Sequence, residues 1–333
     1  MPYLGLQKNL LPTVQVSLLT SGVISLTSTL ATATASATYL YGGSPESRQF
    51  QGQMLKFNHH TNVLTWTGHA NNRGTSGCGF SNNGVKGYAI IGLKTDNTDN
   101  VANSTREVLD YATDVTTYQS NQLSQNKVNP STVVNGSTAG YICGGNVAGS
   151  ASDNVNKMPF STETNSSLGA ILSPERNGPA GFSSTTVGYV HGGNMVAGGG
   201  AMNTTFDKIT FSTDTRATSS SVLSGSQAQP ASMTNPSVAG YAAGGEGAGY
   251  VSNIRKVLFS TDTASVIGVS LSSARGGAEG GQSNTLGYIF GGYGGSFTDE
   301  IETLNFSSET MGALSAKLFH AMSNPSTFSN HGT

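Results

Sequence analysis

The chain has 333 residues, of which only 10% are charged, and its formal net charge is -2. An average globular protein carries roughly 25% charged residues. Here 44 glycines and many serines, threonines and asparagines take their place. Lysine and arginine form no cluster and no long apolar run occurs, so we expect neither a nucleic-acid partner nor membrane insertion.

The first 36 residues stand outside the repeated part of the chain. They carry no charge after Lys8 and are rich in valine, leucine, serine and threonine, which predicts an extended, β-prone arm. An uncharged arm of this kind aggregates unless something covers it. It either packs along the side of its own domain or docks on another protein, and we favour docking.

A short phrase then recurs six times, with a tyrosine followed by mostly apolar residues and glycine. The tyrosines are 47 to 53 residues apart. A period near fifty that is built from short β-type segments predicts a propeller. The repeated residues are Tyr39, Gly42 and Gly43; Tyr88 and Gly92; Tyr141, Gly144 and Gly145; Tyr189, Gly192 and Gly193; Tyr241, Gly244 and Gly245; and Tyr288, Gly291 and Gly292.

Each repeat continues with a second apolar segment, a turn rich in serine, threonine and acid, and two weaker strands. Four short antiparallel strands make one blade. The prediction is therefore an all-β, six-bladed propeller over residues 37–333. No helical pattern follows the glycines, so we interpret them as positions of close backbone approach and not as a phosphate cradle.

The repeats also alternate. Repeats two, four and six carry an arginine 13 to 15 residues before the tyrosine, namely Arg73, Arg176 and Arg275. Repeats three and five are assigned Asn129-Pro130-Ser131 and Asn235-Pro236-Ser237 there instead. This pattern predicts three copies of a two-blade unit, with the arginines in repeated structural pairing.

The C-terminus contains a further copy of that motif, Asn324-Pro325-Ser326, which we match to Asn235-Pro236-Ser237. We therefore expect the C-terminal strand to pair with the strand at Tyr39 and to close the ring, which removes a free edge. The alternative is that residues 28–37 supply this strand.

The order of residues resembles the Kelch repeat, in which an arginine precedes a Tyr-x-x-Gly-Gly strand and an aspartate-threonine turn. The match is carried in repeat four by Arg176, Tyr189, Gly192, Gly193, Phe211, Asp214 and Thr215, and in repeat one by Trp66. Kelch-like chains rich in glycine, serine and threonine are similar in style to virion proteins of tailed phages, especially those of cyanobacteria. This second resemblance implies a protein of the virion particle.

No residue is assigned a catalytic, cofactor or metal role. The Ser-x-Asp-x-Gly-x-Thr-Trp box of sialidase-type propellers is absent, and His191 stands alone within a strand phrase. We therefore expect a non-enzymatic protein, tail- or fibre-associated, with residues 1–36 anchoring it to other virion proteins. The alternatives are a head decoration protein and, less favoured, a carbohydrate-active propeller enzyme with two converging carboxylates.

Binding is expected at loops rich in asparagine, serine, glycine and tyrosine, which suit polar contacts to a host-surface glycan or protein. Self-association in the particle is a further expectation. The candidate loops run from Ser44 to Gly52, Lys94 to Arg106, Asn194 to Thr205 and Tyr293 to Asp299.

Overall fold

The computed structural model describes residues 15–18, 24–27, 36–45, 52–69, 74–95, 100–120, 123–168, 171–195, 201–219, 225 and 227–331. Every regular element in these ranges is a β-strand. None of the described segments forms a helix that could cross a membrane.

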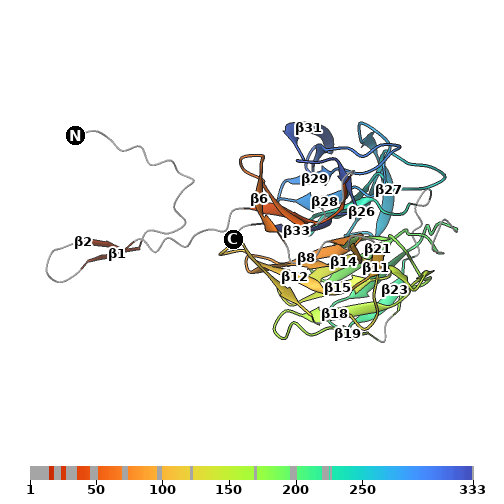
Figure 1. The fold of residues 1–333 in the computed structure, drawn as a ribbon, viewed down its shortest axis with the longest axis horizontal. Coiled ribbons are helices and arrows are strands. Elements are labelled where there is room, and N and C mark those ends of the chain that lie inside the picture. The colour runs from red at the N-terminus through yellow and green to blue at the C-terminus, as the bar shows by residue number, and fades with distance from the viewer. Residues whose placement is uncertain are drawn as a thin grey trace.

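Six sheets of four antiparallel strands form the main body of the protein (Figure 1). This confirms the predicted six-bladed β-propeller. In order from the central channel outward, the strands of each blade are β33 (Ser326–Asn330), β3 (Ala37–Tyr41), β5 (Gln53–Asn58) and β6 (Val63–His69); β8 (Cys78–Asn82), β9 (Lys86–Ile90), β12 (Arg106–Asp110) and β13 (Val115–Gln119); β14 (Ser131–Asn135), β15 (Ala139–Cys143), β18 (Val155–Pro159) and β19 (Ser166–Ser167); β20 (Ala180–Ser183), β21 (Val187–His191), β22 (Phe206–Thr210) and β23 (Thr215–Thr218); β24 (Ala231–Asn235), β25 (Ala239–Ala243), β26 (Asn253–Leu258) and β27 (Thr263–Ser270); and β28 (Glu279–Gln282), β29 (Leu286–Phe290), β30 (Glu300–Asn305) and β31 (Thr310–Lys317).

Blade one is built from both ends of the repeat region. Its innermost strand, β33, pairs antiparallel with β3, so that Ser326 lies opposite Tyr41 and Asn330 opposite Ala37. The alternative, in which residues just before Ala37 supply this strand, is not the arrangement found.

One motif match made from the sequence is wrong. Asn235 ends β24 and faces Ala239 across the turn to the next strand, whereas Asn324 comes two residues before the start of β33. The counterpart of Asn324 in blade five is Gln229, ahead of β24. Asn235 and Asn324 both begin the letters Asn-Pro-Ser in a turn, so only the strand register distinguishes them.

Smaller elements complete the described structure. Two short sheets lie where the blades meet, one formed by β4 (Ser44–Pro45) with β32 (Met322–Ser323), and one by β7 (Gly74–Thr75), β10 (Leu93–Thr95) and β11 (Asn100–Ala102). A third pairs β16 (Asn146–Val147) with β17 (Ser150–Ala151). Within residues 1–36, β1 (Gln15–Leu18) pairs antiparallel with β2 (Ile24–Thr27). The rest of the arm, from which attachment was expected, lies outside the described residues apart from Ser36.

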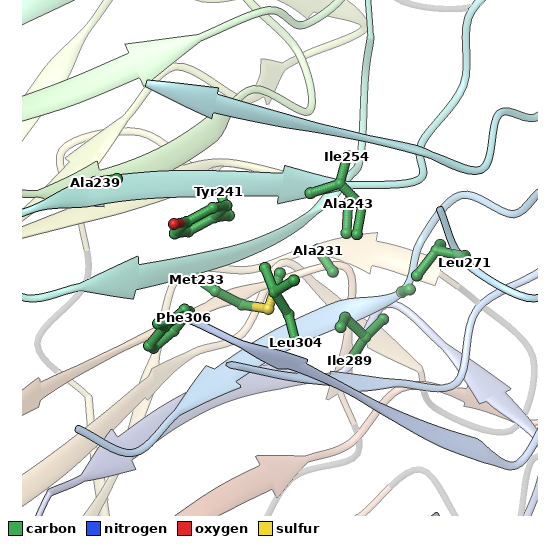
Figure 2. Packing of buried hydrophobic residues seen from close by; sticks show 11 residues of the cluster. Ala231, Met233, Ala239, Tyr241, Ala243, Ile254, Leu271, Ile289, Leu304 and Phe306 are labelled. Atoms are coloured by element: carbon green, nitrogen blue, oxygen red, sulfur yellow. The ribbon is translucent and has the colours of Figure 1, made fainter. Parts of the chain in front are cut away.

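Neighbouring blades pack through apolar side chains that interdigitate between their sheets. Between blades five and six, Met233 and Tyr241 face Leu304 and Phe306, and Ile289 lies beside them (Figure 2). All five side chains are at most 6% exposed. Such burial, at about 25 cal/mol per Å² of apolar surface, is the main force that holds the blades together.

A glycine makes room for each of these contacts. In blades two to six the residue before the repeat tyrosine is glycine. A Cβ added at this position would collide with an apolar side chain of the preceding blade. At Gly240, for example, a Cβ would lie 2.0 Å from the ring of Phe182. The other four are Gly87 against Phe328, Gly140 against Phe80, Gly188 against Val133, and Gly287 against Met233.

The blades also associate in pairs around the channel. A Cβ on Gly79, Gly181 or Gly280 would lie within 2.2 Å of a backbone oxygen on the first strand of the preceding blade. These three glycines belong to blades two, four and six. Close contacts therefore join blades one and two, three and four, and five and six, as three copies of a two-blade unit would.

A closed ring of backbone hydrogen bonds surrounds the channel at one end. Six residues, one ahead of each innermost strand, each donate an N–H to the carbonyl of the next, over 2.7 to 3.0 Å. All six have positive φ between 50° and 64°, a conformation that costs energy for residues other than glycine. The ring runs through Ser76, Asn324, Gly277, Gln229, Gly178 and Asn129.

Candidate functional site

The two ends of the propeller are made of different chain segments. The second strand of each blade runs back toward the hydrogen-bonded ring. The loops that join second and third strands therefore lie at the ring end. In one of these loops, Tyr293 forms a β-bridge with Gly276, the neighbour of the ring residue Gly277. We call this end the loop face. Ala37 and Asn330 lie opposite each other at the other end, which also carries the turns between third and fourth strands. We call it the terminus face.

The repeat tyrosines belong to the framework and not to an open site. All six are at most 2% exposed. Five of them donate a hydrogen bond, over 2.7 to 3.0 Å, to a carboxylate in the following blade. The pairs are Tyr39 with Asp114, Tyr88 with Glu163, Tyr141 with Asp214, Tyr189 with Asp262, and Tyr241 with Glu309.

A lysine completes each of these five contacts at 2.5 to 2.7 Å from the same carboxylate. In four blades the lysine is on the third strand, as with Lys256 in β26. In blade two Val108 takes that position, and Lys86 of β9 reaches Glu163 instead. We refer to each set of tyrosine, lysine and carboxylate as a clasp between blades.

The pKa values of the clasp groups follow from this arrangement. Burial and the hydrogen bond to Glu309 both raise the pKa of Tyr241 above its usual range. For Glu309 burial acts to raise the pKa, but hydrogen bonds from Lys256 and Tyr241 outweigh it and lower the pKa. The carboxylate therefore remains charged at neutral pH and stays bound to its partners.

The sixth blade boundary, where the ring closes, is built differently. Asn62 holds the turn position that acids hold elsewhere, with the same positive φ of 54°. In place of a clasp, the ring of His59 stacks on Tyr288 with centroids 4.7 Å apart. The nitrogens of His59 contact the hydroxyls of Ser36 at 2.7 Å and Thr38 at 2.8 Å, and burial lowers its pKa to about 3.

The glycine pairs also join blades. Gly245 has a φ of 108° and donates its N–H to the carbonyl of Arg275 in the next blade over 2.7 Å. A Cβ on Gly244 would lie 2.6 Å from that same oxygen. Close backbone approach therefore explains the pair, and the same bond recurs at Gly43, Gly145, Gly193 and Gly292.

Two of the three predicted arginines form buried ion pairs within their own blades. Arg176 lies 3.0 Å from Asp207, and both side chains are fully buried. Arg275 lies 3.3 Å from Glu302, with both at most 3% exposed. Burial lowers the pKa of Arg176 against the attraction of Asp207, which raises it.

Arg73 lies outside the described residues. Thr75 pairs with Leu93 as Asn177 bridges Asn194, so Gly74 is the residue equivalent to Arg176. A Cβ on Gly74 would lie 2.9 Å from Ile91, which replaces the first glycine of the pair in blade two. Gly74 thus stands where blades four and six carry their buried arginines.

A channel of about 480 Å³ runs along the axis and is lined mainly by serine, threonine and glycine. Six of its twelve serine and threonine hydroxyls join adjacent innermost strands. Thr132 donates to the carbonyl of Gly79 and Thr327 to that of Gly280, both over 2.7 Å, and Ser183 accepts from the N–H of Val134. Hydrogen bonds between neighbouring innermost strands therefore hold part of the channel wall together.

Glu279 is the acidic side chain among the described residues that line the channel. Burial raises its pKa to about 8, despite a contact from the hydroxyl of Thr327 that lowers it. A glycosidase of the two-carboxylate type needs a second acid roughly 5 to 9.5 Å away. The described channel lining supplies no such partner.

The histidines and cysteines do not converge on a centre. His191 is fully buried, and burial among Phe182, Arg176 and Arg255 lowers its pKa to about 3. Cys78 and Cys143 are buried free thiols. Across the described ranges, no three histidine, cysteine, aspartate or glutamate side chains are grouped to hold a metal ion.

The candidate loops lie on the loop face, and the structure describes them unevenly. Residues 293–299 are fully described, whereas residues 46–51, 96–99 and 196–200 of the other three are not. The equivalent loops of blades three and five, residues 146–153 and 246–252, are described as well.

Sequence reasoning missed the inter-blade role of the turn acids. The letters of Ser212-Thr213-Asp214-Thr215 and its equivalents indicate a turn and nothing more. The available signal was their distance from the tyrosines, since each acid follows its partner by 68 to 75 residues. That separation is longer than one repeat and places the acid in the following blade.

Comparison with known proteins supports the architecture. Among solved structures, that of YjhT superposes with a TM-score of 0.63 over 76% of this chain and 87% of the other, at 16% sequence identity. The chain is a β-propeller. Likeness at this level of identity concerns the fold alone. No family model matches the chain, and no curated protein matches it either.

Proposed function

We propose that the protein is a non-enzymatic binding scaffold of a tailed-phage virion, tail- or fibre-associated. In this proposal residues 1–36 anchor it to another virion protein and the loop face is displayed. The observation that carries it is the separation of the two faces. The chain enters the propeller beside Asn330 on the terminus face, while the loops of varied sequence lie on the opposite face.

The disposition of charge supports a scaffold in place of an enzyme. The clasp acids are held by lysine and tyrosine, and Asp207 and Glu302 are held by buried arginines. Catalysis by acid–base chemistry needs groups free to exchange protons with a substrate. Composition supports the virion setting, because low charge with abundant hydroxyl and glycine residues is the basis of the resemblance to phage particle proteins.

Cross-linking of purified particles that contain the chain tests this proposal. Lys8 is the one lysine in residues 1–36. We expect its amine to form cross-links to a different virion protein. Lys94, next to a displayed loop, serves as the comparison and should give none. Cross-links from Lys8 only to the propeller's own lysines would contradict the anchoring role.

Immunogold labelling of the same particles distinguishes locations. Label at the tail or its fibres is expected. Label on the head would instead support the head decoration alternative, and hydrolysis of host-surface polysaccharide by the purified chain would overturn the non-enzymatic proposal.

A further inference from the structure

An aromatic cluster lies on the loop face where blades five and six meet. It consists of Tyr250 from one loop and Tyr293 and Phe297 from the next. The rings of Tyr250 and Tyr293 are 5.7 Å apart at 77°, and those of Tyr293 and Phe297 are 5.0 Å apart at 60°. Steep angles of this kind form a corner and not a flat stack. Tyr250 is 38% exposed, so the corner reaches the surface.

A carboxylate stands beside these rings. Glu246 bridges Tyr250 across the same short loop, and its charge acts on the pKa of Tyr250, which burial, Glu246 and Tyr293 all raise. Burial also raises the pKa of Glu246 itself. No lysine, arginine or histidine of the described chain forms an ion pair with it. A partly desolvated carboxylate without a cation is a costly feature unless a ligand supplies the charge.

The loops that carry the cluster are short and internally bonded. Gly247 donates its N–H to the carbonyl of Gly249 over 2.7 Å, and Gly294 donates to Ser296 over 3.2 Å. Tyr293 and Gly276 exchange two backbone hydrogen bonds. A Cβ on Gly276 would lie 2.8 Å from the side chain of Glu246, so that side chain lies against the next blade. The site is therefore held in place before any ligand arrives.

The charge at the cluster is negative. An anionic ligand would meet the carboxylate of Glu246, which forms no ion pair with a cation of the described chain. The electrostatics select a cation or, less strongly, a neutral group.

We propose that Glu246, Tyr250, Tyr293 and Phe297 form a binding site for a quaternary ammonium group. Aromatic faces attract such cations through their electron-rich centres, and the carboxylate neutralises the charge. A quaternary ammonium has no N–H to satisfy, which suits a site whose one strong acceptor is Glu246. The inference goes beyond the scaffold function and does not depend on where in a particle the protein sits.

Titration of the full-length chain with choline and with tetramethylammonium tests the proposal, by calorimetry and by tyrosine fluorescence. The matched control ligand is 3,3-dimethylbutan-1-ol, which has the shape of choline without its charge. We expect both cations to bind and the alcohol to bind at least about fivefold more weakly, because cation–π attraction and the ion pair each contribute. Binding should weaken as salt rises.

Variants locate the site. Glu246→Gln and Tyr250→Leu should each weaken choline binding by about two- to fivefold. Glu175→Gln removes an equally negative, exposed side chain near the same face and should leave binding unchanged. Thermal melting of each variant checks that the fold is retained.

Three results would overturn the proposal. Equal binding of choline and the neutral alcohol would reveal a merely apolar patch. Choline affinity that is unaffected by Glu246→Gln would place any binding elsewhere. A change in tyrosine fluorescence that neutral oligosaccharides cause and choline does not, and that Tyr250→Leu abolishes, would identify a saccharide site.

Discussion

Gly281 leaves the space that the side chain of Thr38 occupies. A Cβ on Gly281 would lie 2.3 Å from the hydroxyl of Thr38. At the other five blade boundaries the glycine belongs to the second strand of the following blade and the larger residue to the innermost strand of the preceding blade, as with Gly240 and Phe182. The boundary that closes the ring therefore places its glycine on the sixth blade and the bulkier residue on the first.

Substitution Gly281→Ala should destabilise the protein by about 1–3 kcal/mol, the usual cost of overpacking. The change should act through space alone, because Gly281 is not among the glycines with positive φ. Thr38→Gly removes hydrogen bonds to His59 and Ser329 and destabilises by itself, but it also removes the clash. The double variant should therefore lose less than the sum of the two single losses, which urea unfolding of all three variants measures. A neutral Gly281→Ala would show that the boundary is loosely packed.

Removal of one clasp hydroxyl, by Tyr241→Phe, should lower the free energy of unfolding by about 1 kcal/mol, the typical net value of such a hydrogen bond. The matched control is Tyr288→Phe at the closing boundary, where His59 and not a carboxylate faces the ring. Its effect should be smaller. Equal losses for both variants in chemical denaturation would mean that the clasp acid adds nothing.

The clasps predict sensitivity to acid. Burial acts to raise the pKa of Glu163, but hydrogen bonds from Lys86, Gln119 and Tyr88 leave the pKa lower than its usual value of 4.5. A carboxyl whose pKa is lower in the folded state stabilises the fold above its unfolded pKa, and loses this contribution as pH falls through the folded value. Glu163→Gln should therefore destabilise the protein at pH 7 and make its melting temperature less dependent on pH between about 5 and 3.

Glu279 should behave in the opposite way. Burial raises its pKa to about 8, so the folded state binds a proton more tightly than the unfolded chain between pH 4.5 and 8. Stability then falls as pH rises through this window. Glu279→Gln should stabilise the protein at pH 9 by about 1–3 kcal/mol, with little change at pH 4.5. Calorimetric melting of both proteins across that range is the measurement, and parallel pH profiles would refute it.

The buried ion pair of blade four offers a further test. Arg176→Met should cost about 3–5 kcal/mol, because it leaves Asp207 charged and buried. The double variant Arg176→Met with Asp207→Leu should be less destabilised than the single one, since no uncompensated charge remains. Additive losses in thermal unfolding would show that the two side chains act independently.

The repeats show most clearly which features of the fold can be predicted from the sequence. The spacing of the tyrosines and the alternation of apolar residues were sufficient for blade number and strand order, because both are local patterns that repeat six times. Asn235 shows the limit. Its Asn-Pro-Ser letters also occur before β14 and β33, and a turn motif does not say which turn it occupies.

The glycine and tyrosine positions were determined by the sequence alone as parts of a scaffold, since each depends on backbone geometry that its own repeat imposes. Tertiary structure decided what these residues contact. The carboxylate that accepts the hydrogen bond of Tyr241 comes from the following blade. Tyr250 and Tyr293, which contact each other, belong to two loops and are 43 residues apart in the chain. Such contacts depend on how blades turn about the common axis, which no stretch of sequence within one repeat can specify.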